Sequence, residues 1–543
     1  MDAASRQQAE REGFFNKVKI VAGLTLLSRV LGMLRDIAIT SLGASRTTSA
    51  FVLAFKIPNL FRRLFGEGAL SAAFVPVFSE TAEKSGFERA ARLFANALGL
   101  LAVTISSVVV ALWLGLLVWG ALFPGQWDRQ LLLRLLSLML PFTITTCLLA
   151  LGSAALNCRG RFAYPAFAPI LLNVFLIAAA WLVAPMWRDR LEGQLTVIAA
   201  AVTLAGAAQL VGVLWLLKRT GFSTRPRLRP VEEGIKPILK LMLPMIIGLG
   251  FLQISELLND LIAWIFSATA HAPTIYLFGR EVQRPLGEGV LMRVYAAQRL
   301  YQFPMGVLAI SLGVVVFPLF SRYAARGDLP NLRESLNRAV RLAVLEGLAA
   351  GVGLFVLAEP ITRLIFLHRR FTPADAASSA FILRIYVLGL WAYCTYQIFV
   401  RAFYSLKDTR TPLIISCCLV VPNLAMVAGL IWVPWLGAGA FGVATAVTFS
   451  LNAVILGVLL RRRIGPFGGR KLAFSLARSL LACAAMAGTI RLLLASLAGR
   501  ADWIVVAICV PAGAAVFILV AWLLRCPELG ELLRRPPKEN ADL

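Results

Sequence analysis

Long apolar runs recur along the whole chain, separated by short charged or Pro- and Gly-rich breaks. A helix needs about 20 apolar residues to cross the roughly 30 Å hydrocarbon layer of a membrane. The pattern therefore predicts an all-α integral membrane protein with about fourteen transmembrane helices. The predicted spans lie at 18–44, 48–79, 93–123, 131–156, 162–185, 194–217, 237–267, 291–320, 340–367, 377–405, 411–433, 436–460, 472–498 and 502–524.

The breaks between spans predict the domain organisation and the orientation in the membrane. Most Lys and Arg residues outside the spans fall in the two ends of the chain and in the loops after even-numbered spans. Under the positive-inside rule this distribution places both termini in the cytoplasm. The predicted parts are an N-lobe (1–217), a basic cytoplasmic linker (218–236), a C-lobe (237–460), an added helix pair (461–524) and a cytoplasmic tail (525–543).

The two halves of the chain resemble each other weakly. The second span ends in FVPVFSE (74–80) and the eighth in VFPLFSR (316–322), and each has an earlier proline, Pro58 or Pro304. Proline removes a backbone hydrogen bond from a helix, so both residues predict kinks. Matching interrupted helices in two halves are typical of transporters built from repeats, with the substrate site between them.

Composition supports a membrane protein and excludes other classes. Hydrophobic residues make up 59% of the 543 residues, and the mean hydropathy is +0.78. The net charge of +26 would suggest nucleic-acid binding in a soluble protein. Here basic loops and a cationic interior explain it, so we expect no nucleic-acid partner. The cysteines lack C-x-x-C spacing, and His271 and His368 are the only histidines, so we expect no metal site.

Ionic residues inside three of the apolar spans are the most informative feature. A central Arg costs about 2.5–3.5 kcal/mol on membrane-insertion scales, so these side chains must face one another or a water-filled cavity. They are Arg29, Arg35 and Asp36 in the first span, Lys56, Arg62, Arg63 and Glu67 in the second, and Arg299 in the eighth.

Internal salt bridges account for only part of this set, because six basic residues stand against two acids. Arg matches phosphate bidentately and stays charged when partly desolvated. The surplus therefore predicts a cavity for a multiply anionic substrate, such as a pyrophosphate head group. Arg29 and Arg35 lie about 120° apart around a helix and both can border it, whereas Arg62 and Arg63 diverge by about 100°.

Several strings in the chain resemble the MurJ (MviN) family of lipid II flippases, within the MATE-like multidrug/oligosaccharidyl-lipid/polysaccharide exporter superfamily. The resemblance covers most of the chain to about residue 460. The strings are SRVLGMLRD (28–36), AFKIPNLFRRLFGEGALSAAFVPVFSE (54–80), NCRGRFAYPAFAPILLN (157–173), LQISELLND (252–260), RLYQFPMGVLAISLGVVVFPLFSR (299–322) and AFYSLKDTRTP (402–412).

The resemblance implies a multi-pass protein of the bacterial inner membrane, a monomer, that flips lipid II between leaflets by alternating access and is not an enzyme. It implies two six-helix lobes around a cationic cavity, with a lipid-tail groove formed by the last two helices. Lipid II and membrane lipids would be its partners. The substrate-binding residues implied by position are Arg29, Arg35, Asn59, Arg62, Arg63 and Arg299, with Glu67 in the same signature.

The chain departs from the family pattern in a few places. Ser49, Gln298 and Gln302 occupy positions where the family commonly has acids, which leaves the cavity more positive. The segment 271–289 resembles an insertion on the outer face. Asp260, inside the seventh span, is a candidate cation ligand or a helix-packing residue.

The sequence has no G-x-x-x-x-G-K-[ST] loop, so we expect no nucleotide cofactor and an energy source in an ion gradient or the membrane potential. Three other functions remain open. An exporter of another polyprenyl-pyrophosphate-linked oligosaccharide would use the same cationic cavity. A membrane enzyme acting on polyprenyl phosphates would need clustered acids or histidines, and a scaffold without a ligand would leave the buried arginines unexplained.

Overall fold

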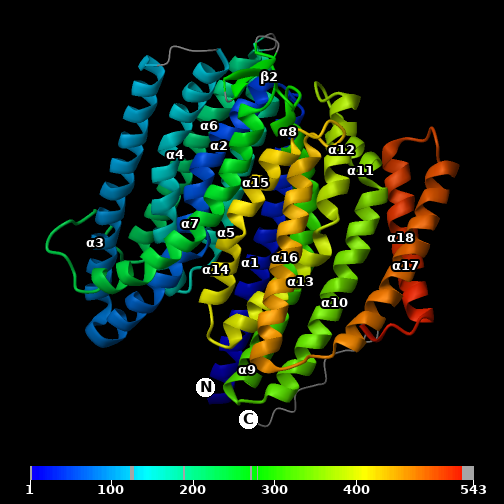
Figure 1. Cartoon of the computed structure of the whole chain (residues 1–543). Coiled ribbons are helices and arrows are strands. Elements are labelled where there is room, and N and C mark those ends of the chain that lie inside the picture. The colour runs from blue at the N-terminus through cyan, green and yellow to red at the C-terminus, as the bar shows by residue number, and fades with distance from the viewer. Residues whose placement is uncertain (1–2, 123–126, 188–189, 270–271, 278, 529–543) are drawn as a thin grey trace. The chain divides into compact units, whose positions relative to one another are not determined.

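We analysed a computed structural model of the chain, which describes residues 3–122, 127–187, 190–269, 272–277 and 279–528. Side chains are described over this range except at residues 3–18, 66–69, 127, 244, 249, 310 and 470. The described chain forms two compact units, residues 1–265 and 266–543. Both are built almost entirely of helices (Figure 1), which confirms the predicted fold class.

The first unit ends with α7, beyond the predicted linker. Its helices are α1 (Ala3–Thr40), α2 (Arg46–Phe61), η1 (Arg62–Ala69), α3 (Leu70–Leu122), α4 (Trp127–Cys158), α5 (Ala163–Ala178), η2 (Ala179–Val183), η3 (Ala184–Trp187), α6 (Leu191–Arg219) and α7 (Ile235–Ile265). α7 belongs here because it packs against α2, η1 and α3. The compact units thus divide after Ile265 rather than at 218–236, and the assignment of α7 to a six-helix C-lobe stays a prediction.

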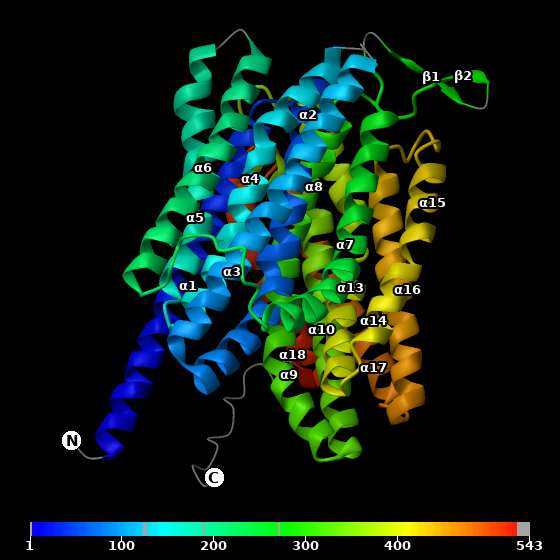
Figure 2. The same cartoon turned by 90° about the vertical axis from the view of Figure 1, so that its left-hand side faces the viewer.

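α4 lies at the centre of the first unit and packs against α2, α3 and α6. Its Leu135, Met139 and Phe142 are fully buried and recur at helical spacing on one face. α1 packs against α5, and α5 packs against α6 (Figure 2). Large apolar side chains on the outer faces, such as Leu117 and Val211, stay exposed, as expected of helices that meet lipid.

The second unit begins with a small hairpin and continues with helices. The strands β1 (Thr274–Leu277) and β2 (Arg280–Gln283) pair antiparallel, with Ile275 opposite Val282. They lie within the predicted 271–289 insertion (Figure 2), in which residues 271 and 278 fall outside the described residues. The helices are α8 (Val290–Pro304), η4 (Met305–Ala309), α9 (Ile310–Ala325), α10 (Leu329–Val356), α11 (Ala358–Phe366), α12 (Pro373–Val387), α13 (Leu390–Ser405), α14 (Arg410–Cys418), α15 (Val420–Leu430), α16 (Gly439–Ile464), α17 (Gly469–Ser496) and α18 (Asp502–Leu523).

Among the described residues, eleven helices are long and apolar enough to cross a membrane, or twelve if the bent pair α12 and α13 forms one span. α1 is not among them, because its apolar part carries Arg29, Arg35 and Asp36. One of the eleven, the run Arg46–Leu122, covers two of the predicted spans. Every predicted span contains a helix, but the count of fourteen stays a prediction.

The run Arg46–Leu122 contains a sharp break at Gly86, where φ is 81° and ψ is 163°. A residue with a side chain rarely adopts this backbone conformation, whereas glycine has no Cβ to oppose it. The break separates the predicted spans 48–79 and 93–123. Glycine therefore makes the turn between two membrane helices that are otherwise continuous.

Both predicted kink prolines precede a π-helical segment. Pro58 lies in the last turn of α2, directly before η1, and Pro304 ends α8, directly before η4. A proline leaves the carbonyl oxygen four residues earlier without its usual helical partner, which favours a local change in winding. A second proline, Pro76 in α3 or Pro318 in α9, follows each segment. The same order of features thus recurs in both halves.

A buried ionic cluster holds the last helix pair to the rest of the second unit. α17 packs against α18 and α10. The Glu528 carboxylate is fully buried after α18, with Oε1 2.8 Å from Ser475 Oγ and 3.3 Å from Arg341 Nε. The sequence analysis identified no polar contact for this helix pair, so the anchor was not predicted.

Candidate functional site

Cationic and acidic side chains form an ion-pair ladder between α2–η1 and α7. Lys56 Nζ lies 2.8 Å from Asp260 Oδ2 and 3.7 Å from Glu256 Oε2. Arg63 Nη1 lies 2.9 Å from the same Glu256 oxygen and donates to Gln253 Oε1 at 3.1 Å. Residues at this spacing lie on one face of each helix, and the pairing order shows that the helices run antiparallel.

A second cluster holds Arg35 of α1 in place. Arg35 donates from Nε (3.0 Å) and Nη2 (2.7 Å) to Asp36 Oδ1, and from Nη1 to Asn173 Oδ1 at 3.1 Å. Asn173, on α5, in turn donates to the Ser28 carbonyl at 3.0 Å. Asp36 is buried, and the Arg35 side chain is 16% exposed. The guanidinium is therefore pre-oriented while part of it remains accessible.

The remaining predicted residues of the first unit differ in their surroundings. Arg62 Nε donates to Asn59 Oδ1 at 2.8 Å, one turn earlier on the same chain segment. Arg29 is exposed, and it makes no hydrogen bond or ion pair with another side chain that the structure describes. The side chain of Glu67 lies outside the described residues.

The charge balance of the first unit remains positive. Arg29, Arg35, Lys56, Arg62 and Arg63 give five positive charges. The acids of the same segments are Asp36, Glu256 and Asp260, which pair with them, and Glu67, whose side chain lies outside the described residues, so the difference, five minus four, is +1. The sequence analysis missed Glu256. Its position four residues before Asp260 places the two acids on one face of α7, which was a usable signal.

Arg299 belongs to the second unit, where one of its partners is the amide of Gln302. Its Nη1 donates to Gln302 Oε1 at 3.1 Å, and its Cζ lies 4.5 Å from the centre of the Tyr295 ring. Gln298 donates to the Tyr386 hydroxyl at 3.1 Å. Both of these neighbours of Arg299, Gln302 and Tyr295, are uncharged. The convergence of its guanidinium with those of the first unit stays a prediction.

Ser49, the third departure from the family pattern, is buried in α2. Its hydroxyl oxygen makes no hydrogen bond within the described part of the chain.

A buried cation that sequence reasoning missed joins three helices of the first unit. Arg46, at the start of α2, is 5% exposed, and its Nη2 lies 2.8 Å from Asp128 Oδ2 of α4. Its Cζ lies 3.4 Å from the centre of the Trp264 ring, and Nη1 donates to the Trp264 carbonyl. Arg46 sits at a loop boundary in the sequence, where an arginine is normally solvated. Only the packing of α2, α4 and α7 reveals its role.

The ladder predicts an asymmetric response to charge removal. Asp260→Asn should lower the free energy of unfolding by about 1–3 kcal/mol, because it leaves Lys56 with only the more distant Glu256. Glu256→Gln should cost about 0–1 kcal/mol, because that carboxylate is 48% exposed. Unfolding of the purified protein in mixed micelles measures both values, and equal losses would contradict a dominant Lys56–Asp260 pair.

Comparison with known proteins places this arrangement in a family. Residues 38–510 match the sequence profile described as "Lipid II flippase MurJ". The "Probable lipid II flippase MurJ" of Vibrio cholerae serotype O1 is 30% identical over 497 residues, which cover 89% of this chain and 90% of the relative. The chain belongs to the MurJ family. The "Lipid II flippase MurJ" of Burkholderia cenocepacia is 31% identical over 460 residues, covering 83% of this chain and 84% of that one.

Solved structures support the MurJ fold. A lipid II flippase MurJ in an inward closed conformation superposes with a TM-score of 0.74 at 21% identity, covering 95% of this chain and 99% of the other. An inward-facing multidrug resistance MATE family transporter of the MOP superfamily gives a TM-score of 0.67 at 14% identity, covering 82% and 97%. These matches show that the chain shares the fold of these two transporters. The named relatives are transporters, so the chain belongs with transporters rather than enzymes.

Proposed function

We propose that this protein flips lipid II from the inner to the outer leaflet of the bacterial cytoplasmic membrane by alternating access. The observation that carries the proposal is the positive surplus on α1, α2 and η1, within membrane helices of a chain of the MurJ family. Relatives across nearly nine-tenths of the chain are named as lipid II flippases. Lipid II carries a pyrophosphate, which is the anion that such a surplus suits.

The arginines divide into two roles in this proposal. Arg35 and Arg62 hold fixed positions through Asp36, Asn173 and Asn59, so their guanidinium groups need little further ordering to meet an anion. Arg29 is exposed and provides a mobile charge for first contact. Arg299, in the second half of the chain, supplies a further positive charge for the pyrophosphate.

Lys56 and Arg63 have a different role, because α7 carboxylates already neutralise them in part. An arriving pyrophosphate competes with Glu256, the most exposed acid of the ladder, for Arg63. Exchange of Arg63 between carboxylate and phosphate would loosen α7 from η1. Substrate binding is in this way linked to the contact between two membrane helices.

The energy for transport comes from the membrane rather than from a nucleotide. The potential is worth about 2.3 kcal/mol per charge per 100 mV, so a cavity with several net positive charges responds strongly to it. An inside-negative potential favours return of the empty cationic site toward the cytoplasm. Both termini face the cytoplasm, and the protein works as a monomer. No cofactor takes part beyond a monovalent ion.

Depletion of the protein in its host bacterium tests the proposal. Lipid II exposed on the outer face of spheroplasts should fall, and lipid II on the inner leaflet should accumulate, as measured with a membrane-impermeant reagent that labels the head group. Restoring the wild-type gene is the control. Unchanged outer lipid II, with accumulation of a different polyprenyl-pyrophosphate-linked oligosaccharide, would replace this proposal by the related exporter function.

A further inference from the structure

The connector between α6 and α7 lies against the second half of α3 as an extended strap. Arg227 N donates to the Ala95 carbonyl at 3.0 Å, and Asn96 Nδ2 donates to the Arg227 carbonyl at 3.0 Å. Asn96 Oδ1 also accepts from Glu232 N at 3.0 Å. At Gly99 an added Cβ would lie 2.6 Å from the Arg227 carbonyl oxygen, so glycine allows this close approach. The strap therefore has a defined position on the helix.

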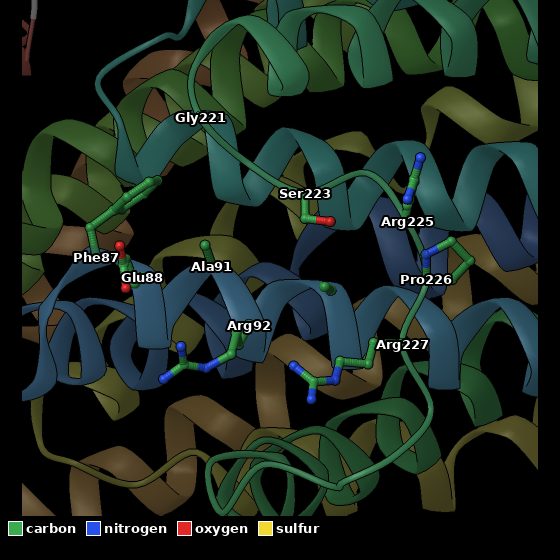
Figure 3. A pocket seen from close by; sticks show the side chains of 10 residues that line it. Phe87, Glu88, Ala91, Arg92, Gly221, Ser223, Arg225, Pro226 and Arg227 are labelled. Atoms are coloured by element: carbon green, nitrogen blue, oxygen red, sulfur yellow. The ribbon is translucent and has the colours of Figure 1, made fainter.

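A cavity of about 480 Å³ lies between the strap and α3, and we call it the connector pocket. Figure 3 shows Phe87 and Glu88 at one end, Arg225 and Pro226 at the other, and Arg92 and Arg227 between them. Its volume falls within the about 300–1,000 Å³ that is typical of small-molecule sites. The other lining residues are Ala91, Ala95, Gly221 and Ser223.

The charge of the connector pocket is positive. Arg92, Arg225 and Arg227 line it, against the single acid Glu88. Arg225 and Arg227 are exposed, and neither forms an ion pair with a side chain in the described ranges. Arg92 is partly neutralised, because its Nε lies 3.6 Å from Glu232 Oε1. No described acid therefore neutralises Arg225 or Arg227, although Arg227 Nε donates to the Arg229 carbonyl at 3.2 Å. Phe87 and two alanines supply the apolar part of the lining.

The connector pocket lies next to the end of a membrane-length helix. It begins two residues after α6, a membrane-length helix that ends at Arg219. Arg219 Cζ lies 3.9 Å from the centre of the Trp215 ring, and Arg159 Cζ lies 4.4 Å from the centre of the Phe87 ring. Trp and Arg in this arrangement are typical of the head-group layer of a membrane. Lipid phosphates lie at the same depth.

We infer that the connector pocket binds a phosphate-bearing anion, held by Arg225 and Arg227 beside the apolar part of the lining. Arg presents paired N–H donors that fit phosphate oxygens, and a partly apolar cavity strengthens each contact. Two sources have this chemistry, the head group of an anionic phospholipid and a soluble phosphate. The inference does not depend on lipid II transport, since the pocket is built from the strap and α3 alone.

Binding to the full-length protein in phosphatidylcholine nanodiscs tests the inference. One arm titrates phosphatidylglycerol, measured as lipid retained in native mass spectra, and the other titrates inorganic phosphate by calorimetry. The double variant Arg225→Gln/Arg227→Gln should weaken binding by at least about tenfold. Ala91→Leu, which fills the cavity without changing its charge, should also weaken it. Thermal unfolding of each variant verifies that it remains folded.

Two control variants separate the pocket from other basic regions. Arg462→Gln removes an exposed arginine at the end of α16 and should leave binding unchanged. Arg500→Gln removes an exposed arginine from the loop between α17 and α18 and should also leave binding unchanged. A variant-sensitive preference for phosphatidylglycerol identifies a lipid ligand, and equal sensitivity in the phosphate arm identifies a soluble one. Binding that neither pocket variant changes, or that Arg462→Gln weakens equally, overturns the inference.

Discussion

Replacing Arg29, Arg35 or Arg299 by alanine is expected to abolish lipid II flipping while the protein still reaches the membrane. A hydrogen bond to a charged group contributes about 1.5–3 kcal/mol, so losing one guanidinium lowers substrate affinity by about ten- to a hundredfold. Arg29 gives the cleanest result, because no described side chain depends on it. Outer-leaflet lipid II in cells, normalised to protein abundance, is the measurement.

Controls for this expectation address charge, geometry and folding. Arg500→Ala removes an exposed arginine from the loop between α17 and α18 and should not affect flipping. Arg35→Lys keeps the positive charge beside Asp36 but loses the bidentate geometry, so it should fold normally and transport poorly. Normal flipping in all three alanine variants would disprove the assignment of these arginines to the substrate site.

Asp128→Ala is expected to lower the free energy of unfolding by about 3–5 kcal/mol, because it leaves a buried cation without its carboxylate. Arg46 is 5% exposed, and its other neighbours include the ring and the carbonyl oxygen of Trp264. Reversible unfolding in mixed micelles measures the effect. The first unit should lose stability as a whole, since Arg46 joins α2, α4 and α7.

An exposed pair on the second unit is the matched control for Asp128. Arg363 and Asp502 lie 3.2 Å apart with side chains 42% and 30% exposed, so Asp502→Ala should cost only about 0–1 kcal/mol. The double variant Arg46→Met/Asp128→Leu removes both buried charges and should recover much of the loss. Similar losses for Asp128→Ala and Asp502→Ala would show that burial does not strengthen the Arg46 pair.

Helix positions could be predicted from the sequence, but their partners could not. Each of the fourteen predicted spans contains a helix. Charged residues flank Gly86 in the sequence, so the two predicted spans end and begin on either side of it. The break in the structure lies at this glycine. Hydropathy says nothing, however, about which helix faces which. The grouping of α7 with α2, η1 and α3 depends on contacts between residues far apart in the sequence. The burial of Glu528 depends on such contacts too.

The candidate site shows the same division between chemistry and geometry. Arginines within apolar spans are visible in the sequence because each is costly in lipid. Their neutralising partners are less visible, since Glu256 lies on a helix far along the chain and Asn173 carries no charge. Arg46 was missed for the opposite reason, because arginine at a loop boundary is common. Burial, rather than residue type, distinguishes it.

The π-helical segments after Pro58 and Pro304 give each half of the chain one extra residue within a membrane-spanning helix. A π-helical segment holds an extra residue per turn, and passing that residue along the helix rotates the segment beyond it by about 100°. Arg62 and Arg63, the first residues of η1, are adjacent and so point in different directions. Moving the extra residue by one position would turn Arg62 toward α7 in place of Arg63 without unwinding the helix.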